Sequence, residues 1–247
     1  MKLVAALDAF TFALAAIAFQ SLRVREVPPA ARPRGVWIAD TAEGVRYLRR
    51  HRLLRRLVAA GAAAMVASAL SSTATYAMLD AGLHQAPALA GVLLAVQGLG
   101  SILSGLAAGT LMRRIPEHRY AAAGLALFAA GVLARATPWL PVVLGGSLAI
   151  GLGLVCPLLA ALTALQRLTP SELLGRVAAT ANTAMFAPTG LAVLLGAGMV
   201  ATLDYRIQTL LAGALGLLTA VGLAAVKTSR PLTAHHGAAT SHEDSAD

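Results

Sequence analysis

Long apolar runs separated by short polar segments dominate the pattern of this 247-residue chain. A helix that crosses a membrane needs about 20 mostly apolar residues, because the hydrocarbon core is about 30 Å thick. Barrel strands use only about 9–11 residues, so the runs are too long for them. The pattern therefore predicts an all-α integral membrane protein with about seven transmembrane helices. The predicted spans are 3–22, 57–79, 87–112, 120–136, 140–165, 177–203 and 207–226.

Composition supports this prediction. Hydrophobic residues make up 57% of the chain and charged residues 13%, with a mean hydropathy of +0.71. A soluble domain usually has about twice that charged share, and a soluble core of this size cannot bury so much apolar surface. Disordered chains have low hydrophobicity. A soluble globular domain and a disordered chain are therefore both excluded.

The chain has 20 Lys and Arg residues against 11 Asp and Glu, a formal net charge of +9. Nucleic-acid binding needs basic charge on a soluble face, so no nucleic-acid partner is predicted. Seventeen of the basic residues fall after odd-numbered spans, and cytoplasmic loops carry such an excess. The distribution predicts a multi-pass plasma-membrane protein with its N-terminus outside and its C-terminus in the cytoplasm.

The polar segments suggest four parts. Residues 1–22 form the first spanning helix, 23–56 a basic cytoplasmic linker, 57–226 a six-helix bundle and 227–247 a disordered cytoplasmic tail. Within the linker, residues 36–54 have an amphipathic helical pattern. Such a helix either lies in the membrane interface, its basic face toward anionic headgroups, or only ties two spans together.

Polar residues at membrane depth are candidates for function, because hydrocarbon penalises them. Asp8 is the one carboxylate within a predicted span and a possible proton-coupling group, although snorkelling toward external water explains it equally well. Gln97, Asn182 and Thr75 are substrate-cavity candidates, with hydrogen bonding between helices as the alternative. No catalytic pair or metal-ligand pattern falls at this depth in the sequence, so no enzyme, cofactor or metal site is predicted.

Small residues recur every four positions in the third span, at Ser101, Gly105 and Gly109. Stripes of this kind let helix backbones approach closely, so this face is predicted to pack against another helix. Pro157 and Pro188 interrupt the fifth and sixth spans and permit bends. Closely packed, bendable helices suit a transporter that rocks between states, but also any compact bundle.

Three segments carry a family resemblance: 44–55, 109–114 and 165–177. They resemble the entry to the seventh helix, a short basic loop motif and the loop between the tenth and eleventh helices of the major facilitator superfamily, in its bacterial multidrug and siderophore exporter branch. The resemblance places cytoplasmic loop-motif residues at Gly109, Arg113, Arg114, Gly175 and Arg176. Arg113 stands where the family's loop usually has an aspartate.

The resemblance implies that the seven spans correspond to helices six to twelve of the major facilitator fold, the C-terminal half plus one helix. It implies a transporter that carries out proton-driven efflux, by antiport, of small lipophilic molecules such as a drug, antibiotic or siderophore. It also implies that the chain is a truncated or partial form of that transporter. The lipid bilayer, the substrate and protons are the expected partners, with a missing N-terminal half or self-association. The alternatives are a non-transporting half-size membrane subunit and a seven-helix receptor.

Overall fold

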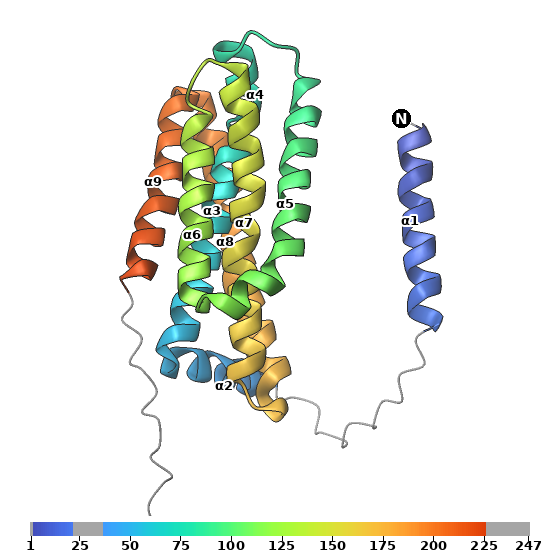
Figure 1. The fold of residues 1–247 in the computed structure, drawn as a ribbon, viewed down its shortest axis with the longest axis vertical. Helices are drawn as coiled ribbons and strands as arrows, with labels where there is room; N and C mark the ends of the chain where they lie inside the picture. Colours follow the sequence, from blue (N-terminus) through green and yellow to red (C-terminus); the bar gives the residue numbers. More distant parts are fainter. Residues whose placement is uncertain (1, 22–36, 226–247) are drawn as a thin grey trace, which may run out of the picture. The chain divides into compact units, whose positions relative to one another are not determined.

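The computed structural model describes residues 2–21 and 37–225, and all of their regular structure is helical (Figure 1). The chain divides into two units, Met1–Val36 and Trp37–Asp247. The first contains helix α1 (Lys2–Ser21). The all-α prediction is confirmed. The first part of the predicted linker and the predicted disordered tail lie outside the described residues.

Helical structure covers most of each predicted span, although α6 ends at Ala134 and the span 57–79 is divided at Ala74. Five helices are long and apolar enough to cross a membrane, and α6 is not among them because its 18 residues begin with the polar sequence Glu117-His118-Arg119. Of α1, the stretch Asp8–Ser21 forms a shorter apolar helix. The described part of the second unit contains α2 (Trp37–Arg50), α3 (Arg52–Thr73), α4 (Thr75–Ala77), the π-helix η1 (Met78–Gly82), α5 (Leu89–Arg114), α6 (Glu117–Ala134), α7 (Leu140–Leu168), α8 (Ser171–Thr202) and α9 (Tyr205–Ala224).

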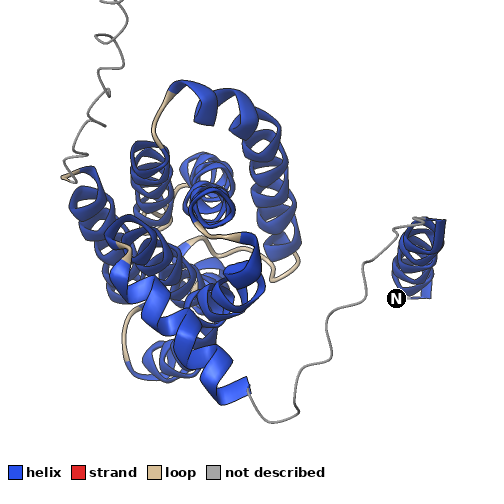
Figure 2. Cartoon of the chain, turned by 90° about the horizontal axis from the view of Figure 1, so that it is seen from below, coloured by secondary structure: helices blue, strands red, loops and turns tan. Residues whose placement is uncertain are grey.

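The long helices of the second unit run alternately up and down, and α2 lies across one end of them (Figures 1 and 2). Because direction alternates, this α2 end also holds the α5–α6 and α7–α8 connections and the end of α9. Eleven described arginines lie at this end, against two at the other. The eleven are Arg46, Arg49, Arg50, Arg52, Arg55, Arg56, Arg113, Arg114, Arg119, Arg167 and Arg176.

Glycines set the contact between α6 and α7, which is the most extensive helix pair of the bundle. A Cβ on Gly131 would lie 2.5 Å from the carbonyl oxygen of Gly146, and one on Gly146 would lie 2.7 Å from that of Gly131. Gly124 and Gly153 oppose each other one to two turns along. The two backbones touch directly, which only glycine permits.

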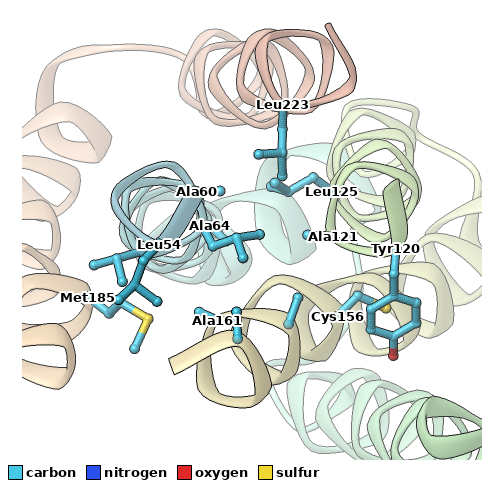
Figure 3. Packing of buried hydrophobic residues seen from close by; sticks show 14 of the residues in the cluster. Leu54, Ala60, Ala64, Tyr120, Ala121, Leu125, Cys156, Ala161, Met185 and Leu223 are labelled. Atoms are coloured by element: carbon cyan, nitrogen blue, oxygen red, sulfur yellow. The ribbon is translucent and has the colours of Figure 1, made fainter. Parts of the chain in front are cut away.

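The largest buried cluster lies toward the α2 end, where α3, α6, α7, α8 and α9 meet (Figure 3). Leu54, Leu125 and Met185 supply its larger side chains, and alanines such as Ala64 and Ala161 fill the narrow spaces. Between close helices, small side chains give van der Waals contact without forcing the backbones apart. The bundle is therefore held mainly by close packing of small residues.

The predicted packing stripe of α5 requires a correction. Ser101 does contact α7, where its Oγ lies 3.3 Å from the Gly151 carbonyl oxygen. Gly105 and Gly109 are exposed, and a Cβ on either would meet nothing within 4 Å. Gly100, one residue away from Ser101, is buried against α7 instead. The packed positions of α5 therefore fall one residue earlier than the predicted stripe. A helix that is apolar all round has no polar face that would reveal its orientation in the sequence.

The loop-motif glycines also lie elsewhere than expected. Gly175 lies inside α8, and Gly109 lies more than one turn before the end of α5, so neither glycine is in a loop. Prolines make the α5–α6 and α7–α8 turns: Pro116 is the N-cap of α6 and Pro170 the N-cap of α8. Proline lacks an N–H group and suits the start of a helix, so it ends one element and begins the next.

Candidate functional site

A buried arginine lies inside the bundle at the end opposite α2. Arg135 follows the last residue of α6, and only 5% of it is exposed. Its Nη2 donates to Ser147 Oγ of α7 at 3.0 Å and to Gln97 Oε1 of α5 at 3.4 Å. Its Nη1 lies 3.5 Å from Ser71 Oγ of α3. We call these four residues the Arg135 centre; it joins four helices through one guanidinium.

Two of the three predicted cavity residues are associated with this centre. Gln97 belongs to it and is half-buried. Thr75 lies one turn beyond Ser71, and its Oγ1 donates to the Ser71 carbonyl oxygen at 3.3 Å. Between Ser71 and Thr75 the α-helix breaks at Ala74. The chain then continues through the short α4 into a π-helix that begins at Met78. Such interruptions free backbone groups and often lie at functional sites.

A second polar contact ties α9 to α3. Gln208 is fully buried, and its Nε2 donates to the Leu70 carbonyl oxygen at 2.9 Å and to Thr73 Oγ1 at 2.7 Å. The amide bridges the turn of α3 that precedes the break at Ala74. Hydrogen bonds of this kind hold membrane helices together. The contact holds α9 against α3 at Leu70 and Thr73, on either side of Ser71 in the sequence.

A cavity of about 540 Å³ opens between α2 and α8. Its surface is mostly apolar, with hydroxyl groups and one guanidinium along the walls. The lining residues are Thr41, Val45, Gly175, Arg176, Ala179, Thr180, Thr183 and Ala184. Cavities of about 300–1,000 Å³ with a few placed polar groups are typical of small-molecule sites. We call this space the α2–α8 cavity.

Contacts between α2 and the bundle hold the walls of this cavity in place. Glu43 on α2 forms an ion pair with Arg176 on α8. The Tyr47 hydroxyl donates to the carbonyl oxygen of Leu168 at the end of α7, at 2.5 Å. Gly44 lies so close to α8 that a Cβ there would collide with Thr180 Oγ1. The loop-motif residue Arg176 is therefore part of a cavity wall and of a bond between helices.

The remaining predicted residues are neither members of the Arg135 centre nor lining residues of the α2–α8 cavity. Asn182 lies exposed on α8, next to the cavity residue Thr183. Asp8 is exposed on α1, and its carbonyl oxygen accepts a hydrogen bond from Thr11 Oγ1 at 2.8 Å. Arg113 and Arg114 are exposed in the last turn of α5. Over the described ranges, no three His, Cys, Asp or Glu side chains lie close enough to hold a metal ion.

Sequence reasoning misjudged one central residue. Arg135 lies at the end of the predicted span 120–136, next to the exposed turn at Thr137-Pro138-Trp139, and is not among the predicted site residues. The structure turns its side chain into the bundle instead. Its position at the end of an apolar run was the one local signal, and nothing in the sequence placed it beside Gln97, Ser71 and Ser147. The α2–α8 cavity had no such signal, since it depends on how α2 folds back.

A bundle of long apolar helices with a polar centre in its interior defines a multi-pass helical membrane protein. A family model described as Major Facilitator Superfamily matches residues 56–245. The chain belongs to the major facilitator superfamily.

A curated relative is the "Multidrug resistance protein B homolog" of Mycobacterium tuberculosis (strain CDC 1551 / Oshkosh), with 36% identity over 100 residues. The match covers 37% of this chain and 18% of that protein, so the chain matches less than a fifth of its relative's length. No solved structure matches the chain at comparable significance.

Proposed function

We propose that this chain forms one half of a secondary active transporter, which exports small lipophilic molecules by exchange with protons. It acts as a non-enzymatic membrane component in the plasma membrane, with its N-terminus outside and its C-terminus in the cytoplasm. The observation that carries the proposal is the α2–α8 cavity, because its size and mostly apolar surface fit a drug-sized lipophilic molecule. The name of the multidrug resistance relative agrees with this substrate class.

The location of the cavity suits export. It lies at the α2 end, where the arginines gather, and positive residues favour the cytoplasmic side. A molecule that enters from the cytoplasm or the inner leaflet meets this cavity first. Thr180 and Thr183 supply hydroxyl groups that orient a bound molecule, while Val45 and Ala184 bury its apolar surface.

The exposed face of α8 favours contact with a second half of the transporter. Asn182 and Thr183 lie exposed on the 32-residue helix α8, and the exposed apolar side chain Phe186 follows one turn later. An amide that faces lipid has no partner for its polar atoms, so this face is better suited to protein or a water-filled path. We therefore assign this face to the contact with a further set of helices, from another chain or another part of the same protein.

Asp8 is the proposed proton-coupling group. Coupling requires a titratable group whose protonation differs between two conformations, since binding shifts an equilibrium only through different affinities for its states. Asp8 is a carboxylate within the first apolar helix, and it is exposed on α1. A neutral Asn at this position keeps the size of the side chain and removes the titration.

A filling mutation tests the assignment of the cavity. Ala184→Phe places an aromatic ring in the α2–α8 cavity, and Ala197→Phe makes the same change on an exposed position of α8 farther along the helix. Binding of rhodamine 6G to the chain in nanodiscs is followed by fluorescence anisotropy, with empty nanodiscs subtracted. We expect Ala184→Phe to weaken binding at least tenfold and Ala197→Phe to change it less than twofold. Equal affinities in both variants would remove the cavity from the proposal.

A further inference from the structure

The geometry points to the Arg135 centre as a binding site for a monovalent anion, either the carboxylate of an organic molecule or a small inorganic anion such as chloride. This site is separate from the α2–α8 cavity, since none of its four residues lines that cavity. The inference concerns binding alone and does not require that the chain transports anything.

The first argument is charge. Arg135 keeps its positive charge under ordinary conditions, because the guanidinium is a very strong base. It is 95% buried, yet no Asp or Glu of the described residues forms an ion pair with it. Its three side-chain partners are all neutral. Buried charges are normally paired with an opposite charge, because leaving water is costly for an ion. A bound anion supplies the missing charge.

The second argument is unused hydrogen-bonding capacity. A guanidinium has five N–H donors. The buried Nε of Arg135 has no hydrogen-bond partner. Of the three side-chain contacts that the Nη1 and Nη2 atoms make, those to Ser71 and Gln97 are long, at 3.5 and 3.4 Å. Carboxylates accept two parallel hydrogen bonds from a guanidinium at about 2.7–2.9 Å, so an anion fits these donors better than the present neutral oxygens do.

The neutral partners can also turn toward an anion. Ser71 presents its hydroxyl oxygen to Arg135, and hydroxyl rotation would turn its hydrogen to a bound anion instead. Gln97 presents its Oε1 to the arginine, and rotation of the amide would present the NH₂ group. The centre thus offers one permanent charge and two adaptable donors from three different elements of the bundle.

The centre lies close to the surface. Gln97 is half-buried, and Thr137, two residues after Arg135, is exposed in the α6–α7 turn. Ser71 lies three residues before the break in α3 at Ala74, where the helix is least regular. A small anion therefore has a short path from the end opposite α2, with an adaptable helix beside it.

The test measures binding to the purified full chain in detergent. Benzoate and its uncharged analogue benzamide are titrated separately, and heat release and the thermal unfolding midpoint are recorded. Chloride is titrated in the same way against a chloride-free buffer. Arg135→Gln removes the charge, Arg135→Lys keeps it without the guanidinium fork, and Arg206→Gln is the matched control at an exposed arginine of the same end.

We expect saturable binding of benzoate and no saturable binding of benzamide. The affinity for benzoate should fall at least tenfold in Arg135→Gln and stay within twofold of the wild-type value in Arg206→Gln. Competition by chloride at similar concentration assigns the site to inorganic anions, and its absence assigns it to carboxylates. Equal binding of benzoate and benzamide, or anion binding unchanged in Arg135→Gln, would overturn the inference. If Arg135→Gln does not fold, Arg135→Lys decides, since unchanged benzoate affinity in that variant contradicts a guanidinium site.

Discussion

The Nη2 atom of Arg135 lies 3.0 Å from the Oγ atom of Ser147, so a charged group at the end of α6 is bound to the second turn of α7 inside the bundle. Ser147 is fully buried, and its own hydroxyl donates to the Val143 carbonyl oxygen at 2.9 Å. This pair is the shortest of the contacts that hold the guanidinium. It therefore makes a sensitive point at which to test whether the buried arginine organises the four helices.

Ser147→Ala should destabilise the bundle. The change leaves Arg135 with its two longer contacts, and loss of a partner for a buried charged donor costs about 1–3 kcal/mol. Ser72→Ala, at an exposed serine of α3, should alter the free energy of unfolding by no more than about 0.5 kcal/mol. Reversible unfolding in mixed detergent measures both. Equal stability of the two variants would show that the Ser147 contact contributes nothing.

The corrected packing face of α5 gives a matched pair of variants. Gly100→Leu should disrupt assembly, because a Cβ there would lie 2.5 Å from the Leu148 carbonyl oxygen and 3.0 Å from the Leu152 nitrogen. Backbone atoms cannot move aside cheaply, so we expect a loss of about 3 kcal/mol or more, at the upper end for overpacked sites. Gly105→Leu should leave the chain unchanged, since nothing lies within 4 Å of that position.

The two α5 variants are compared by measuring their folded yield and their thermal stability in detergent. Equal loss in both would mean that the Gly105 face is also packed, as the Ser101–Gly105–Gly109 stripe first suggested. Loss in Gly105→Leu alone would reverse the assignment of faces.

The proposed orientation is open to direct labelling. Gln85→Cys lies exposed at the end of the bundle opposite α2, and Ser171→Cys lies exposed at the α2 end. On a Cys156→Ala background, a membrane-impermeant maleimide applied to intact cells should label Gln85→Cys only. Ser171→Cys should react after the cells are opened. Labelling of Ser171→Cys from outside would invert the predicted topology.

The positions of the helices were predictable from the sequence, because a spanning helix must be long and apolar whatever it packs against. The break at Ala74 and the π-helix after it were not, since the run 57–79 shows no residue that interrupts it. The family followed from short loop segments and is confirmed by the match to residues 56–245. The gap between the predicted spans 120–136 and 140–165 likewise marks the turn at Thr137-Pro138-Trp139.

Side-chain direction was far less predictable. In a helix that is apolar all round, the choice between Gly100 and Gly105 as the packed position depends on neighbouring helices. Arg135 is the first residue after α6, where snorkelling to water and insertion into the bundle are both possible. Its burial depends on serine and glutamine partners from three distant parts of the chain, which no local pattern relates to one another.

In the function we propose, this chain supplies one wall of a transporter and needs a second set of helices for coupled transport. The purified chain is reconstituted in liposomes, a pH gradient with an acidic interior is imposed, and movement of a fluorescent cationic drug is followed. We predict no gradient-driven movement by the chain alone, and movement once a five-helix N-terminal half of a related transporter is joined to it. Gradient-driven movement by the chain alone that disappears in Asp8→Asn would contradict the account.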